Sequence, residues 1–299
     1  MRVNVMGATG QLGRRVIAAL LERGAAVEDV VGSARTPAKG RGLGVEIREA
    51  DYDDRDSMRR AFSLCDVVLL IPSTAPVEPR VLQHANALDA ARMAGVKRVL
   101  FSSLTTARPG SLFHVSPFLL YAECKTRQSG MEWTILRSNM VLDPVADWMP
   151  ELVRMGRLPY PVRDGRVAYV SRDDLARALA AACLSGGCVG ETYELTGPRA
   201  LSMPELAEIV ARVTGSAVRF ESITEEAFAE ICRDGEEVPE SMIATLASIY
   251  RAVDNGEFSR ATDHVERLTG RAPEAAEDYL RRMWGERGEG RKAESTWSA

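Results

Sequence analysis

The chain has 299 residues, of which 45% are hydrophobic and 27% are charged, so we expect one large or two modest folded domains and little disorder. It carries 38 basic and 42 acidic residues, and no basic stretch is dense enough to neutralise a run of phosphates, which argues against a nucleic-acid partner. The longest apolar run, residues 67–71, is far too short to span a membrane, and the first residues resemble a strand rather than a signal segment. We therefore expect a cytoplasmic protein without a membrane partner.

The first half of the chain alternates short apolar runs with amphipathic stretches. The pattern predicts strands at residues 3–6, 27–34, 44–48, 67–71, 97–103 and 133–137, and helices at residues 11–23, 54–64, 79–95 and 117–129. Ser116 is placed to cap the last of these helices, with Pro117 at its first position. This alternation predicts an α/β fold, a Rossmann-like doubly wound parallel sheet that binds its ligand beyond the carboxyl ends of the strands.

The second half has a different character and predicts a smaller, mostly helical C-terminal lobe packed over the sheet. Strands are expected at residues 167–170, 191–195 and 218–222, and helices at residues 175–184, 203–215, 224–233, 240–254, 259–268 and 273–284, with capping boxes at 171–174 and 202–205. We expect residues 1–140 and 160–186 to form the nucleotide-binding domain and residues 141–159 and 187–285 the substrate-binding lobe. Residues 286–299 are polar and Gly-rich, which predicts a disordered tail.

A glycine motif lies between the first predicted strand and the first predicted helix. Residues 7–13 read GATGQLG, so the glycines are spaced GxxGxxG. The first glycine permits a tight turn, the second lets the backbone approach a pyrophosphate, and the third lets the helix pack closely on the sheet. A glycine turn without a ligand is the alternative for such a motif alone, but its place at the first strand-to-helix turn predicts dinucleotide binding.

The end of the second predicted strand indicates which nicotinamide cofactor is bound. NAD-preferring sites place an acidic residue there, whereas a nearby Arg accommodates the 2′-phosphate of NADP(H). Residues 30–39 read VVGSARTPAK, with no acid at the strand tip and with Arg35 and Lys39 close behind it. This predicts NADP(H) as the cofactor; a solvated basic loop is the alternative.

Several stretches in order resemble a known family. They are GATGQLG at 7–13, RTPAK at 35–39, EADYDD at 49–54, NALDAARMAGVKRVLFSS at 86–103, SGMEWTILRSN at 129–139, VSRDDLARA at 170–178 and YELTGPRALSMPELA at 193–207. The chain resembles the NmrA-like atypical short-chain dehydrogenases from residue 3 to about residue 284. Within that group it is most similar to the branch of NADPH-quinone oxidoreductases and triphenylmethane reductases.

This resemblance implies a set of cofactor contacts. The pyrophosphate would be held by Gly7, Thr9, Gly10, Gln11 and Leu12, and the 2′-phosphate by Arg35 and Lys39. The adenine would contact Asp51 and Tyr52, and the ribose would contact Ile71, Pro72 and Ser73. The nicotinamide would contact Ser102, Ser103, Ser138, Asn139 and Met140. For Ser102, Ser103 and Asn139, polar groups that simply end a strand are an equal alternative.

Catalytic residues are less clearly indicated. Tyr121 and Lys125 have the Tyr-xxx-Lys spacing in which Tyr donates a proton and Lys lowers its pKa. The resemblance, however, places the Lys four residues before Glu123, at Leu119, and the Tyr at Val115. Neither side chain does acid–base chemistry, so a surface pair at 121 and 125 is the alternative reading.

Other candidates surround the predicted mouth of the sheet. Ser103 and His114 are candidate catalytic residues, with an exposed loop histidine as the alternative for His114. Phe113, His114, Met140 and Trp148 are candidates for the substrate pocket. The five cysteines form no CxxC pair and have no ligand partners nearby, so no metal and no disulfide framework are expected.

Together these features predict an NADPH-dependent reductase of a quinone, aromatic ketone or similar planar acceptor, because such substrates accept hydride with water supplying the proton. Two alternatives remain: a non-catalytic NADP(H)-binding redox sensor that signals through a partner, and a polyketide-tailoring isomerase or epimerase on the same scaffold. We expect a small planar molecule as the binding partner and a monomer or homodimer.

Overall fold

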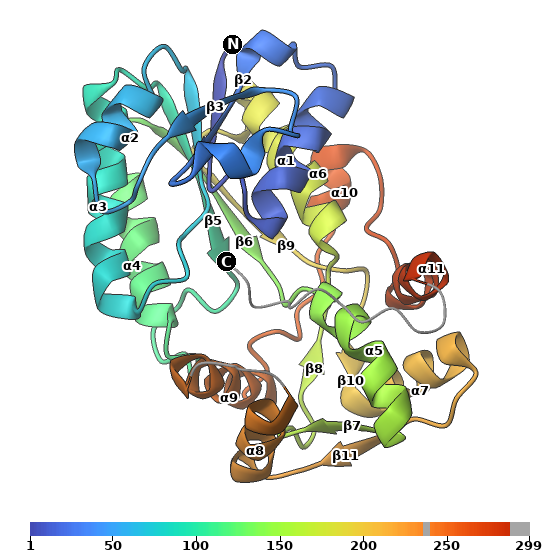
Figure 1. Cartoon of the computed structure of the whole chain (residues 1–299). Coiled ribbons are helices and arrows are strands. Elements are labelled where there is room, and N and C mark those ends of the chain that lie inside the picture. Colours follow the sequence, from blue (N-terminus) through green and yellow to red (C-terminus); the bar gives the residue numbers. More distant parts are fainter. Residues whose placement is uncertain (236–239, 288–299) are drawn as a thin grey trace.

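A seven-stranded parallel sheet forms the larger part of the computed structural model, which describes residues 1–235 and 240–287 (Figure 1). Its strands are β1 (Val3–Met6), β2 (Val30–Ala34), β3 (Glu46–Glu49), β4 (Val67–Leu70), β5 (Arg98–Leu104), β6 (Glu132–Ser138) and β9 (Glu191–Leu195). They lie in the order β3-β2-β1-β4-β5-β6-β9, and every neighbouring pair is parallel. The predicted doubly wound, Rossmann-like sheet is confirmed.

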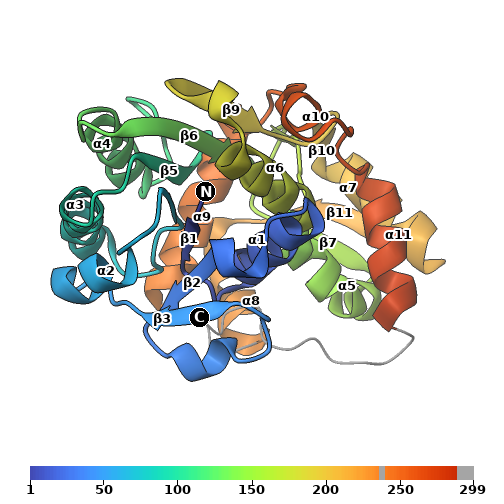
Figure 2. The ribbon, with the colours of Figure 1, turned by 90° about the horizontal axis from the view of Figure 1, so that it is seen from above.

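Helices cover both faces of this sheet, as Figure 2 shows from above. α1 (Gln11–Glu22), α6 (Arg172–Leu184) and α10 (His264–Thr269) pack on one face, and α2 (Arg55–Ala61), α3 (Val77–Met93) and α4 (Ser116–Arg127) on the other. The middle strands are apolar because both of their faces are covered. β4, with the sequence VVLL, is buried along its whole length.

The smaller lobe lies across the carboxyl edge of the sheet (Figure 1). It contains α5 (Asp143–Met155), β7 (Arg157–Tyr160), β8 (Arg166–Val167), β10 (Leu201–Ser202), α7 (Met203–Thr214), β11 (Arg219–Ser222), α8 (Glu225–Gly235), α9 (Glu240–Asp254) and α11 (Ala276–Arg287). β10 pairs antiparallel with β8, and β11 pairs parallel with β7. This lobe is the predicted helical one, and no helix among the described residues is long and apolar enough to cross a membrane.

Two strands, β9 and β8, lie in the other domain from the one predicted for them. β9 hydrogen-bonds to β6 as the edge strand of the large sheet, although it falls in the 187–285 range assigned to the lobe. β8 pairs with β10 inside the lobe, although 160–186 was assigned to the nucleotide-binding domain. Both differences arise because strand pairing is decided by distant segments and not by the order of elements along the chain.

Some local predictions also need correction. α4 begins at Ser116 itself, so Ser116 is not the cap; Val115 precedes the helix without a capping side chain, and the Ser116 hydroxyl lies 2.8 Å from Ser111 Oγ. α5 was not predicted, since Pro150 inside it interrupts the helical pattern. α11 continues through Arg287, so the first two residues of the predicted disordered tail are helical; residues 288–299 lie outside the described part.

The two predicted capping boxes have different outcomes. At Ser202 and Glu205 each side chain binds the other residue's backbone N–H, at 3.3 and 2.8 Å, so this box is confirmed. At Ser171 the hydroxyl accepts from the Asp174 N–H at 3.0 Å, but the Asp174 carboxylate accepts from the Ser171 hydroxyl and from the Glu274 N–H instead. The second contact ties α6 to the segment that leads into α11.

Candidate functional site

The strand order reverses between β1 and β4, so the crevice in which such sheets bind their ligands is expected at the carboxyl edge between these two strands. Gly7 follows β1 with φ +84°, a conformation that favours glycine. Its N–H and that of Ala8 both donate to Ser33 O at 3.0 Å, and a Cβ on Gly7 would lie 3.5 Å from Ile71 Cβ. The loops after β1 and β4 and the end of β2 therefore meet around this glycine.

The amino end of α1 faces the crevice without a capping side chain. Gly10 precedes the helix, and its first turn contains no acidic residue. A Cβ on Gly13 would lie 2.2 Å from Gly7 O, so only glycine lets α1 approach the loop this closely. Because the first amides of a helix have no partner within it, they are left to bind an anion such as a pyrophosphate. The predicted role of residues 7–12 fits this geometry.

A basic group lies beside the tip of β2. Arg35 and Lys39 are exposed, and within the described residues neither side chain has a hydrogen-bond or ion-pair partner. Arg14, in the first turn of α1, donates to Thr9 O at 2.9 Å and to Lys39 O at 2.6 Å. It thus joins the glycine loop to the loop that carries the predicted 2′-phosphate contacts. The sequence interpretation missed Arg14, although a basic residue directly after the last glycine was a visible signal.

Tyr52 fixes the loop that follows β4. Its hydroxyl donates to Ile71 O at 2.6 Å, and burial raises the pKa of this phenol. Asp51 Oδ1 accepts from the Asp53 N–H at 3.0 Å. Asp51 and Tyr52 therefore follow β3 beside the loop of Ile71 and Pro72, so the residues predicted to contact the adenine and the ribose lie on adjacent loops.

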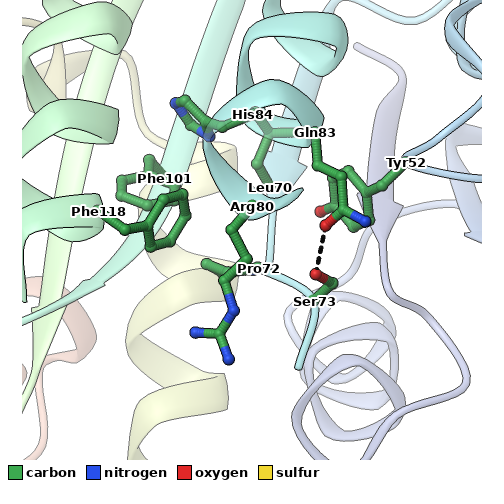
Figure 3. A pocket seen from close by; sticks show the side chains of 9 residues that line it. All are labelled: Tyr52, Leu70, Pro72, Ser73, Arg80, Gln83, His84, Phe101 and Phe118. Carbon is green, nitrogen blue, oxygen red and sulfur yellow. Dashed lines mark hydrogen bonds between the residues drawn. The ribbon is translucent and has the colours of Figure 1, made fainter. Parts of the chain in front are cut away.

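A small cavity of about 10 Å³ lies between the loop after β4 and the helices α3 and α4 (Figure 3). Ser73 Oγ donates to Gln83 Oε1 at 2.5 Å, and Gln83 Nε2 donates to Asp53 Oδ1 at 2.9 Å. The cavity is lined by Tyr52, Leu70, Pro72, Ser73, Arg80, Gln83, His84, Phe101 and Phe118. The predicted ribose residue Ser73 is thus held in place by two side chains that the sequence interpretation did not consider.

Ser103 is engaged in a buried polar cluster. Its hydroxyl donates to Glu123 Oε1 at 2.8 Å, and Arg137 Nε and Nη2 donate to the two oxygens of the same carboxylate at 2.7 Å each. Glu123 has no exposed side-chain surface, and its hydrogen bond and charge raise the pKa of Arg137. The cluster fastens α4 to β5 and β6, and it occupies the Ser103 hydroxyl that was a catalytic candidate. Ser102 points to the opposite face of β5.

Tyr121 and Lys125 lie away from the crevice. Each is two residues from Glu123, which faces the sheet, and two residues turn an α-helix by about 200°. Lys125 is exposed, and its Nζ lies 5.9 Å from the centroid of the Tyr121 ring. The Tyr-xxx-Lys pair therefore lies on the outer surface of α4. Leu119, one turn before Glu123, is buried on the sheet side.

The loop between β5 and α4 is attached to the lobe. His114 Nε2 lies 3.0 Å from Thr245 Oγ1 on α9, and the His114 N–H donates to Ser248 Oγ at 3.4 Å. Burial and the charges of Arg251 and Arg80 lower the pKa of His114. The buried carboxylate of Glu257 accepts from Ser111 Oγ at 2.5 Å and from the Leu112 N–H at 2.8 Å.

Two of the remaining predicted residues, Asn139 and Phe113, are buried rather than open to the space between the sheet and the lobe. Asn139 is buried and its Nδ2 donates to Phe258 O at 3.0 Å, so this amide joins β6 to the lobe. Phe113 is only 4% exposed and packs in the core. Met140 is half-buried, as is Trp148, whose ring stacks on Tyr160 with centroids 6.0 Å apart. Ser138 Oγ donates to Ser103 O at 3.1 Å.

Two hydroxyls at the end of β5 were not predicted. Thr105 Oγ1 and Thr106 Oγ1 are buried and have no hydrogen-bond partner among the described residues. Buried hydroxyls are normally paired, so these two are exceptions. Across residues 1–235 and 240–287, no cluster of three or more His, Cys, Asp or Glu is arranged to hold a metal ion.

Comparisons with known proteins agree with this architecture. Residues 1–280 match the NmrA-like family. The chain is 32% identical over 230 residues to quinone oxidoreductase 2 of Escherichia coli, covering 76% of this chain and 79% of that protein. It is 26% identical over 267 residues to an NAD(P)H azoreductase of Xenophilus azovorans, covering 89% and 92%.

Solved structures give the same result. A quinone oxidoreductase of Escherichia coli complexed with NADPH superposes with a TM-score of 0.88 at 27% identity, covering 94% of this chain and 99% of that one. Triphenylmethane reductase of Citrobacter complexed with NADP(H) superposes with a TM-score of 0.89 at 28% identity, covering 94% and 100%. The predicted family and branch are confirmed.

Proposed function

The chain belongs to the NmrA-like family, and we propose that it is an NADPH-dependent reductase whose acceptor is a quinone, an aromatic ketone or a similarly planar molecule. It is an NAD(P)H-dependent oxidoreductase by its similarity to named reductases. The observation that carries the proposal is the basic group beside the glycine loop, where Arg35 and Lys39 are exposed and unpaired among the described residues.

The chain's own groups account for the phosphates of NADPH. The first-turn amides of α1 suit the pyrophosphate, and Arg35 and Lys39 suit the 2′-phosphate, with Arg14 holding the two loops together. Bound NADPH supplies a hydride from its nicotinamide. The loop of Ile71 and Pro72, held by Tyr52, would line the ribose, and the lobe with residues 141–159 would cover the acceptor.

The nicotinamide end of the crevice offers few acidic groups. Val115 and Leu119, where the family resemblance places acid–base residues, are buried apolar side chains. Charge that develops on a quinone or conjugated dye is delocalised, so solvent can deliver the proton.

The test is NADPH consumption by the purified full chain with a panel of quinones, aromatic ketones and dyes. We expect turnover of several acceptors, a preference for NADPH over NADH, and loss of that preference in Arg35→Ala. Tight NADPH binding without turnover of any acceptor would contradict the reductase and support a redox sensor. Product formed without NADPH consumption would support an isomerase or epimerase.

A further inference from the structure

Arg80 is a half-buried cation without a carboxylate partner in the described part of the chain. It lies in the first turn of α3, where its Nε donates to Ala75 O. Its guanidinium carbon lies 5.8 Å from the centroid of the Phe118 ring. Figure 3 shows the guanidinium pointing away from Gln83 and His84, past Pro72.

This isolation is unusual within the protein. Every other half-buried arginine of residues 1–235 and 240–287 lies within 4.0 Å of a carboxylate; Arg48, Arg137 and Arg177 are examples. The fully buried Arg98 also lacks a carboxylate, but two of its guanidinium nitrogens donate to Ser185 O and Cys183 O. No acidic oxygen of the described residues lies within that distance of Arg80. The outer nitrogens of its guanidinium thus lack the pairing that other partly buried arginines in this fold have.

The location also disfavours a positive charge. The amino end of a helix carries a partial positive charge, so a cation in the first turn of α3 is repelled by it. Burial lowers the pKa of Arg80, which means that the surroundings destabilise the charged form. Neither effect favours the charged form of Arg80, and an anion bound beside it would offset both.

Neighbouring groups add to the positive potential. The charges of Arg80 and Arg251 both act on His114, which places cationic groups from α3 and α9 within electrostatic reach of the loop after β5. Arg251 has a carboxylate at 3.6 Å, Glu225 Oε1, which partly balances it. Arg80 therefore remains the unbalanced charge of this group among the described residues.

The anions of the cofactor already have donors elsewhere. The pyrophosphate and 2′-phosphate sites lie at the amino end of α1 and at the tip of β2, whereas Arg80 lies on the α3 and α4 side of the sheet. Arg80 lies over the ring of Phe118, the residue before Leu119 on α4, and its charge reaches His114, which is a predicted substrate residue. An anion beside Arg80 would thus lie next to the acceptor ring.

We propose that Arg80 binds an anionic substituent of the acceptor, so that the preferred substrates are planar conjugated molecules that carry a sulfonate, carboxylate or phosphate. This inference rests on the reductase function proposed above. The planar guanidinium can bind two oxygens of such a group at once, and Phe118 supports it from one side.

The test compares naphthoquinone with naphthoquinone sulfonate as acceptors. Arg80→Gln should raise KM for the sulfonate about tenfold, as expected for loss of a charge-assisted hydrogen bond, and should change KM for the neutral quinone and for NADPH by less than about twofold. Arg80→Lys should retain part of the preference. Arg92→Gln is the matched control, since Arg92 is an exposed arginine on the same helix, paired with Asp89 at 3.6 Å.

Equal changes in KM for the two quinones in Arg80→Gln, or a rise in its KM for NADPH, would overturn the inference. A wild-type protein that reduces the neutral quinone but shows no Arg80-dependent preference for the sulfonate would overturn it while leaving the reductase function intact. Binding of naphthalene sulfonate, which cannot be reduced, separates the two claims further. About tenfold weaker binding to Arg80→Gln supports the anion site whether or not turnover is seen, and equal binding refutes it.

Arg80→Gln also removes the hydrogen bond to Ala75 O, so both variants should first be compared with the wild type by thermal unfolding. The ratio of the two KM values within one protein does not depend on the folded fraction. A ratio that changes in Arg80→Gln, returns partly in Arg80→Lys and stays constant in Arg92→Gln is the supporting result. A ratio that is the same in all four proteins is the contradicting one.

Discussion

Arg137 donates hydrogen bonds to both oxygens of the buried Glu123 carboxylate, from Nε and from Nη2, each at 2.7 Å. The contact joins the middle of α4 to β6, and Ser103 on β5 adds a third hydrogen bond at 2.8 Å. This ion pair therefore holds α4 against the sheet, with Leu119 buried one turn before Glu123.

Glu123→Gln should destabilise the protein by about 3 kcal/mol, because it leaves the Arg137 guanidinium facing a neutral group in a buried setting. Chemical denaturation measures this free energy of unfolding. Glu151→Gln is the control, since it removes the exposed partner of Arg154 and should leave stability nearly unchanged. Equal effects of the two substitutions would show that the buried pair has no special role.

Tyr121→Phe and Lys125→Ala should each leave kcat/KM within about twofold of the wild type, since both side chains lie on the outer surface of α4. Steady-state kinetics with the best acceptor from the panel measures this. A loss of roughly 10²–10⁴-fold, the size expected for removal of a general acid, would restore the Tyr-xxx-Lys hypothesis.

Gly13→Ala should weaken NADPH binding at least about tenfold and lower the free energy of unfolding by about 2–4 kcal/mol. The added Cβ would lie 2.2 Å from Gly7 O and 2.9 Å from Ala8 Cα, and both contacts are backbone atoms that cannot move aside cheaply. Titration calorimetry and thermal unfolding measure the two effects. Gly42→Ala, where a Cβ meets nothing within 4 Å, is the control and should change neither.

His84 should make the protein less stable as the pH falls. Burial lowers the pKa of His84 from 6.5 to about 4, while its Nε2 lies 3.1 Å from Ala122 O and 3.0 Å from Thr126 Oγ1. The unfolded chain therefore binds this proton more readily than the folded chain, so stability is greatest above pH 6.5 and falls by up to about 3 kcal/mol towards pH 4.

Denaturation curves recorded between pH 6.5 and pH 4 test this dependence. In His84→Gln the side chain no longer titrates, so the slope of stability against pH should be shallower than in the wild type. Equal slopes for the two proteins would mean that His84 does not control the acid sensitivity.

Local sequence patterns predicted the larger part of the fold and the cofactor end of the site. The alternation of apolar runs with amphipathic stretches predicted alternating strands and helices in the first half of the chain. The short helices and strands of the second half predicted the lobe. Gly7 is needed for its positive φ, and Gly13 is needed for the close approach of α1 to the loop after β1. The spacing of the glycines in the sequence indicates both. Arg35 and Lys39 were found because they follow a strand tip that lacks an acid.

Tertiary structure decided the features that depend on distant partners. The face on which Tyr121 and Lys125 lie follows from Glu123 binding Arg137, which the spacing of residues on α4 does not reveal. β9 joins the large sheet because β6 offers it an open edge, and Arg80 lacks a carboxylate because the fold brings no acidic side chain of the described residues within 4.0 Å of it. Periodicity and turn chemistry are properties of neighbouring residues, whereas pairing, burial and unbalanced charge arise only when remote segments meet.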